Sequence, residues 1–190
     1  MSWTQAYNAQ FAKPLVNQII AIIQRDQTAA LAVINAARAV DGNQPLPPIA
    51  EFHKGPGPRT GWPWLSMEIG PTNFERSDDK ATRHCNVRIS LALDTGQYDQ
   101  EMAQEDAQDH ARLLDMIISS AGPWPSLGDW TTSLPIQHET VPSGNTAPNA
   151  VGTVNEVFVE SHVPAKVSVP DVDVPVMRVT VTVMFELEET

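Results

Sequence analysis

The feature that most constrains the fold of this chain is the strict alternation of its last segment, Val174 to Glu188. Apolar side chains occupy every second position, and polar or charged side chains occupy most positions between them. The apolar set is Met177, Val179, Val181, Val183, Phe185 and Leu187, and the polar set is Arg178, Thr180, Thr182, Glu186 and Glu188. A period of two residues is typical of an antiparallel strand with one buried face. The segment therefore predicts a strand in a sheet that is covered on one side.

Four more segments are candidate strands. Trp62 to Ile69 and Arg83 to Asp94 both alternate, and the polar residues 71–82 between them favour a hairpin. Leu134 to Val141 and Asn155 to Val163 follow later in the chain. Together with the last segment, they predict an antiparallel sheet.

The N-terminal part shows helical spacing of its apolar residues. Ala12 to Arg25 predicts an amphipathic helix, and Gln27 to Val40 predicts a second one capped by Asp26, unless the two form one kinked helix. Asp41-Gly42 is expected to end this helical part. The positions expected to face inward in the second segment are Leu31, Ile34 and Ala37.

The clearest helical pattern runs from Asp99 to Ser120. Its apolar stripe also contains one histidine and consists of Ala103, Ala107, His110, Leu114, Ile117 and Ile118. Acidic residues crowd its first half, Glu101 to Asp109, where the helix dipole favours anions. A carboxylate run at helical spacing is expected to form a solvated face.

These elements predict an α+β fold: an antiparallel β-sheet with N-terminal helices and one long amphipathic helix packed on one face. A length of 190 residues suits one domain with a substantial core. Within this single domain we expect a helical N-terminal part, residues 1–42, followed by a Pro/Gly-rich loop, residues 43–61. The remaining residues, 62–190, are expected to hold the sheet and the long helix, with long loops at 142–153 and 164–175.

The charge of the chain argues against specific binding of nucleic acid. The net charge is −11, from 23 acidic and 12 basic residues, and a surface of that sign repels phosphate. The single cysteine excludes an intramolecular disulfide and fits a reducing compartment. We see no signal-peptide pattern and no apolar stretch of membrane-spanning length. We therefore expect a soluble protein of the cytoplasm, or one made there and packed into a particle.

No motif predicts a catalytic, cofactor or metal site. The histidines lack metal-ligand spacing, and Cys85 has no activating context beside it. The stretch Gly55 to Gly61 is glycine-rich, but its prolines and spacing do not fit a phosphate loop. His110 is the only residue that we can name as a candidate for an enzyme or ligand pocket, and a buried structural histidine is the alternative.

Aromatic and acidic side chains are the candidates for surfaces that meet other molecules. The possible interface residues are Trp62, Trp64, Trp124, Trp130 and Phe158. The tryptophans lie near prolines, and they either close the ends of the core or anchor a partner. Glu186 and Glu188 on the polar side of the last strand could line a channel or could simply face water.

Three stretches of the chain carry a family resemblance. They are the helical segment Leu15–Val40 leading into Pro45–Pro63, the strand Arg83–Asp94 followed by the helix Glu101–Ser120, and the closing strand Met177–Leu187. In this order of elements the chain resembles the tail-terminator and head–tail joining (neck) proteins of tailed bacteriophages. The resemblance covers most of the chain and consists of a pattern of elements, without a sequence motif.

The resemblance implies a structural protein of the virion, made in the host cytoplasm and located in the tail or neck. Such proteins form rings, often hexamers, that stop growth of the tail tube and dock the head connector. DNA would pass through the ring without specific binding, and the family contributes no catalytic residues, cofactor or membrane contact. Two alternatives stay open: another phage head-completion or tail-tube-like subunit, and an α+β small-ligand module or enzyme with a pocket between the long helix and the sheet.

Overall fold

The computed structural model of the chain describes residues 12–54, 61–76, 83–95, 103–120, 153–169 and 176–189. These residues contain two helices and a five-stranded sheet, which together form an α+β fold, as predicted. The elements are α2 (Ala12–Val40), β1 (Glu51–His53), β2 (Trp64–Arg76), β3 (Arg83–Asp94), α3 (Ala103–Ser120), β4 (Thr153–Val167) and β5 (Val176–Glu189).

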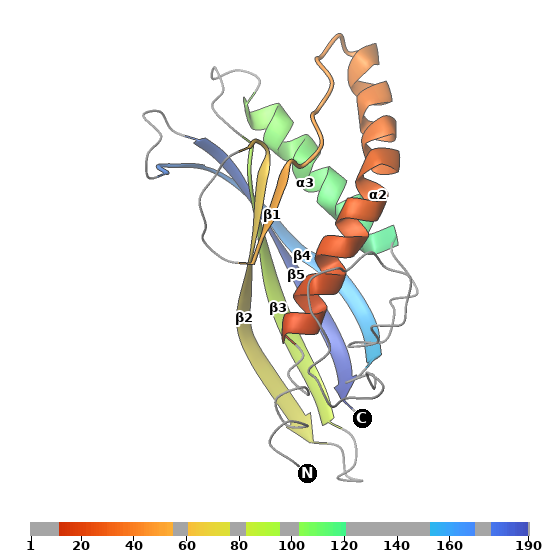
Figure 1. The fold of residues 1–190 in the computed structure, drawn as a ribbon, viewed down its shortest axis with the longest axis vertical. Helices are drawn as coiled ribbons and strands as arrows, with labels where there is room; N and C mark the ends of the chain where they lie inside the picture. Colours follow the sequence, from red (N-terminus) through yellow and green to blue (C-terminus); the bar gives the residue numbers. More distant parts are fainter. Residues whose placement is uncertain are drawn as a thin grey trace, which may run out of the picture.

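The sheet has the strand order β1-β2-β3-β5-β4 (Figure 1). The four long strands pair antiparallel, as predicted, whereas β1 pairs with β2 in parallel. The prediction that residues 43–61 form only a loop is therefore wrong, because β1 lies inside that range. Three residues are too few to show a strand period, and the pairing of β1 depends on β2, which lies further along the chain.

Strand β5 confirms the alternation that its sequence predicts. It lies between β3 and β4, so that both of its edges are hydrogen-bonded within the sheet. Val179, Val181, Val183 and Phe185 are completely buried, whereas Thr180 and Thr182 on the other face are half-buried. The apolar side chains of β5 therefore form the floor of the core, and those of β3 and β2 continue this floor on one side.

Both helices lie on the same face of the sheet (Figure 1). One hydrophobic cluster joins the inward side chains of α2 and α3 to the apolar face of β2, β3 and β5. Val157 and Val159 of β4 pack against the margin of this cluster. Neither described helix is both long and apolar enough to cross a lipid bilayer.

Helix α2 is one continuous helix, so of the two predicted alternatives the helical pair with Asp26 as a cap is wrong and the single helix is correct. The carboxylate of Asp26 accepts two hydrogen bonds of 2.7 Å from the guanidinium of the neighbouring Arg25, and the helix continues past both. The helix ends where predicted, because Gly42 adopts a left-handed φ of 77° and the Gly42 N–H bonds back to the carbonyl of Ala39.

The inward side of the C-terminal half of α2 differs from the prediction at one position. Leu31 and Ile34 are buried, as expected, but Ala37 is exposed. Arg38 occupies the next inward position and is 4% exposed. A step of 100° per residue places residues 31, 34 and 38 on one side of the helix and turns residue 37 away from it.

Several element boundaries also differ from the expected ones. β2 continues past Ile69 to Arg76 through a register shift between Ile69 and Thr72, so part of the expected polar connection is strand. β4 runs on to Val167, so the loop expected at 164–175 starts later. The candidate strand Leu134 to Val141 and nearly all of the expected loop 142–153 lie outside the described residues.

Candidate functional site

The tryptophans predicted as interface residues have different environments. Trp64 is 1% exposed, and its ring stacks on the imidazole of His53 with centroids 4.7 Å apart. Trp64 stands opposite Asp94, on the side of the sheet away from the core cluster, and it is buried there, while Trp62 just before β2 is half-buried. Trp124 and Trp130 lie outside the described residues.

Phe158 and Glu186 lie on the side of the sheet that faces away from the helices. Phe158 of β4 is 39% exposed and stands opposite Met184 of β5. Glu186 is exposed and stands between Asn86 and Glu156 on the neighbouring strands. Glu188, the second predicted channel residue, stands opposite His84 and Thr153 on the neighbouring strands. Its side chain is not among those that the structure describes.

This second side of the sheet is what we call the open face. It consists of the exposed and half-buried residues that alternate with the core positions: Glu68 on β2, Arg88, Ser90 and Ala92 on β3, Thr180, Thr182 and Glu186 on β5, and Glu156, Phe158, Glu160, Ser161, Val163 and Ala165 on β4. No described helix covers this side of the sheet, although Ser66, Asp94 and Met184 on it are buried. The open face is therefore the candidate for contact with another molecule.

Two arginines on this side of the sheet are paired within the chain. Arg88 binds the carboxylate of Glu160 across β5, with a shortest N–O distance of 2.9 Å. Further along, the guanidinium of Arg178 makes two hydrogen bonds to Asp94, whose carboxylate is completely buried. The hydrogen bonds to Asp94 raise the pKa of Arg178 further above its usual range. These cations are consequently not available to a phosphate backbone without breaking existing pairs.

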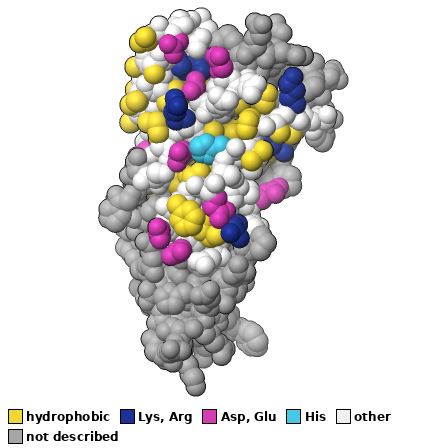
Figure 2. Space-filling view, turned by 180° about the vertical axis from the view of Figure 1, so that it is seen from behind, with side chains coloured by type: hydrophobic (Ala, Val, Ile, Leu, Met, Phe, Trp, Pro, Cys, Tyr) yellow, Lys and Arg dark blue, Asp and Glu magenta, His cyan; other side chains and the backbone are white. Residues whose placement is uncertain are grey.

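Figure 2, seen from behind relative to Figure 1, shows acidic, basic and hydrophobic side chains interspersed among uncharged polar ones. Among the coloured residues there is no broad field of one sign. The middle of the open face is uncharged, because Ser90, Ala92, Thr180, Thr182 and Val163 are its members there. This composition suits contact with a protein surface better than contact with a polyanion.

Strand β4 is the long edge strand of the sheet, and its outer edge pairs with no other described strand. It carries features that limit uncontrolled pairing: two register shifts, a proline at position 164 and the exposed Lys166. The outer edge of β4 is therefore a less suitable contact surface than the open face beside it.

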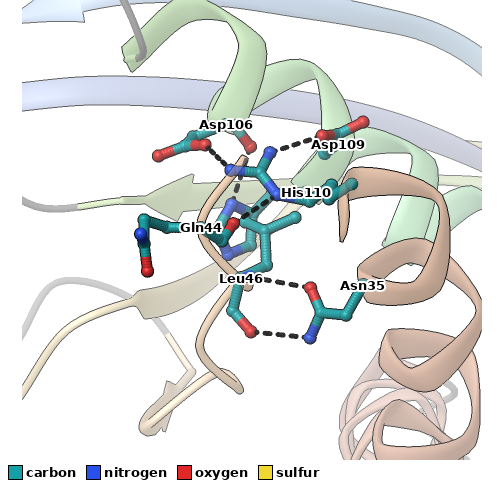
Figure 3. Close-up of polar contacts among 7 residues, drawn as sticks. Asn35, Gln44, Leu46, Asp106, Asp109 and His110 are labelled. Atoms are coloured by element: carbon teal, nitrogen blue, oxygen red, sulfur yellow. Dashed lines mark hydrogen bonds and ion pairs between the residues drawn. The ribbon is translucent and has the colours of Figure 1, made fainter. Parts of the chain in front are cut away.

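A cluster of charged residues joins α2 to α3 (Figure 3). The guanidinium of Arg38 forms ion pairs with Asp106 and with Asp109, the latter at 2.6 Å, and donates a further hydrogen bond of 2.7 Å to the carbonyl oxygen of Gln44. Desolvation lowers the pKa of Arg38, but the two carboxylates outweigh this effect and raise it. The segment that follows α2 is fixed beside this cluster, where the amide of Asn35 makes two hydrogen bonds with the backbone of Leu46.

This cluster was not predicted from the sequence, because an acidic run at helical spacing is typical of a solvated face. Asp106 is buried, and Asp109 is only partly exposed. Two signals were present: an arginine at an inward position of one helix, and two carboxylates three residues apart on another. Their pairing depends on how the helices cross, which the periodicity of either helix alone does not specify.

His110 lies beside this cluster and is completely buried. Its Nδ1 lies 2.8 Å from the carbonyl oxygen of Asp106, one helical turn earlier. Burial lowers the pKa of His110, and the charge of Arg38 acts in the same direction, while the carbonyls of Asp106 and Pro47 oppose them. The ring is therefore neutral near pH 7 and has no access to a dissolved substrate.

The described residues include no group of three or more His, Cys, Asp or Glu side chains that could hold a metal ion. Cys85 lies in β3 opposite Phe74 and Leu187, and its side chain lies outside the description. Gly55 to Thr60 of the glycine-rich stretch also lie outside it. Comparison with known protein families found no matching family model, and comparison with curated proteins found no significant match.

The buried ion pairs of Arg38 can be tested by mutation. Arg38→Met removes the cation and leaves two carboxylates in a site built for their partner, so we expect the free energy of unfolding to fall by about 3 kcal/mol. The control is Arg25→Met, which breaks the exposed ion pair with Asp26. This variant is expected to change the free energy of unfolding by less than about 0.5 kcal/mol. Urea unfolding followed by circular dichroism measures both. Equal effects of the two variants would contradict the structural role of Arg38.

The burial of neutral His110 predicts a pH dependence of stability. The unfolded chain binds a proton at this histidine near its ordinary pKa of about 6.5, whereas the folded chain binds it only at lower pH. Stability should therefore fall as the pH drops below about 6.5, by up to about 1.4 kcal/mol per pH unit from this residue. Urea unfolding at pH 7.5 and 5.5 should show a smaller loss for His110→Gln than for the wild type, and an identical loss would contradict the assignment.

Proposed function

We propose that this protein is a structural subunit of a tailed bacteriophage that forms a ring of six copies at the head-proximal end of the tail. In this role the ring ends the tail tube and presents a surface to the head connector. The observation that carries the proposal is the one-sided sheet: helices cover one face, and the other face is left with exposed apolar side chains and internally paired charges.

The open face supports a role in assembly because of its composition. Phe158 and Val163 are large apolar side chains that stay 39% and 54% exposed. They lie on the same side of β4 as Ser161; Val163 stands opposite Thr180, and Phe158 stands opposite Met184. Apolar anchors among neutral polar groups are typical of a protein–protein contact.

The negative net charge of the chain suits the inner surface of a channel through which DNA passes. With a net charge of −11, the subunit repels phosphate, and the exposed Glu186 adds a carboxylate at one end of the open face. We therefore propose that DNA passes through the ring without specific binding. The tail tube protein and the head connector or adaptor proteins are the proposed partners, and the virion is the proposed location.

The enzyme alternative has less support from the geometry. His110 was its only named candidate, and this side chain is completely buried and is kept neutral among structural contacts. A catalytic base must reach a substrate proton directly or through one water molecule. We accordingly propose a role without catalysis.

Light scattering over a range of concentrations tests the proposed function. We expect the purified full-length chain to form a species of about six subunits, roughly 125 kDa from the subunit mass of 20.8 kDa. The six-subunit mass should be reached at high protein concentration. Adding DNA should not change it. A strict monomer at every concentration, alone and when mixed with isolated tail tubes, would contradict the proposal.

A further inference from the structure

The outward side of the C-terminal half of α2 is apolar and is not covered by the described part of the chain. The set that we call the outer face of α2 is Ala29, Ala32, Val33, Ala36 and Val40, all of them exposed. Val33 is 61% exposed and Val40 is 86% exposed. The spacings of four, three and four residues from Ala29 through Val33 and Ala36 to Val40 place them on one side of the helix, opposite Leu31 and Ile34.

The outer face of α2 carries no charge in a strongly acidic chain. Between Gln27 and Val40 the only charged residue is Arg38, and it points inward to Asp106 and Asp109. In Figure 2 hydrophobic side chains gather along the upper left margin, the side on which α2 lies after the half-turn from Figure 1. Two copies of a chain with a net charge of −11 repel each other least where both contacting surfaces are neutral.

The middle of the open face is the second neutral surface of the chain. Its hydroxyl and small apolar side chains carry no charge, and Arg88 nearby is already paired with Glu160. The outer face of α2 is about 16 Å long at 1.5 Å per residue. The stretch of β4 from Phe158 to Ala165 is about 23 Å long and contains one charged residue, Glu160, which is paired with Arg88, so one such helical face fits on it.

We propose that the outer face of α2 in one copy packs on the open face of the sheet in the next copy. A helix with an apolar side and a sheet without a second layer complete each other in this way. Because α2 lies on the covered side of the sheet, the two surfaces belong to opposite sides of one subunit (Figure 1). The contact is therefore head-to-tail, the type that forms a ring when the rotation from copy to copy closes and an open filament when it does not. This inference rests on the proposed ring-forming function and names the surfaces that would build the ring.

Cross-linking between engineered cysteines tests the contact. In a Cys85→Ser background we would compare Val33→Cys, Val163→Cys and the double variant, each treated with a short bismaleimide. The double variant should give a ladder of linked species up to the ring, and each single variant should stay unlinked because a head-to-tail contact separates identical positions. The control pairs Val33→Cys with Gln108→Cys on the exposed side of α3 and should give no ladder.

The outcomes separate the failure of this contact from the failure of the proposed function. A ring-sized mass by light scattering without linked species in the double variant would overturn the contact and leave the ring in place. Linked dimers of Val33→Cys alone would show that two α2 helices pair, which also overturns it. A strict monomer would contradict the ring itself.

A charge placed on the outer face of α2 provides an independent measurement. Ala36→Glu should weaken self-association at least tenfold, since it puts a carboxylate into a neutral contact between acidic chains, whereas the helix should remain intact by circular dichroism. Gln108→Glu adds the same charge on the exposed side of α3 and should leave self-association within twofold of the wild type. Equal effects of the two variants would overturn the proposed contact.

Discussion

Burial of one face of the sheet under both helices is the constraint on which the rest of the structure depends. The alternating side chains of β5 and β3 supply a continuous apolar floor, and α2 and α3 cover it with Leu15, Ile19, Leu113 and Leu114 among their completely buried residues. The same alternation sends every other side chain to the opposite face, which neither of the described helices covers. One property of the sequence, its period of two, thus produces both a stable core and an uncovered surface.

The charged cluster around Arg38 determines how the two helices sit on that floor. An apolar contact between helices tolerates several crossing geometries, whereas an arginine paired with two carboxylates and a backbone carbonyl permits few. By holding α2 to α3 and to the segment after α2, Arg38 also directs the outer face of α2 away from the core. In this way an interior ion-pair cluster contributes to the proposed contact between subunits without taking part in it.

The fold class and most elements could be predicted from periodicity, because the strands Arg83–Asp94 and Val176–Glu189 alternate over many residues. β1 could not be predicted, since its three residues become a strand only by pairing with β2. The continuity of α2 could not be decided from the sequence because Asp26 is a good N-cap residue, yet its carboxylate pairs with Arg25. The burial of Asp106 was missed because its partner lies 68 residues away, and pairings over such separations depend on tertiary structure. The open face was implied by the alternation itself, while its bulges and its paired charges required the three-dimensional register.

The central claim is that a one-sided sheet in this chain completes its second layer with a helix from another copy. Electron cryomicroscopy of the purified oligomer tests it most directly, because the position of α2 relative to the strands of the neighbouring subunit is visible at helix resolution. The account predicts a closed ring in which α2 of each subunit lies across the open face of the next. A ring whose open faces are all exposed to solvent, or an assembly joined by paired α2 helices, would contradict it.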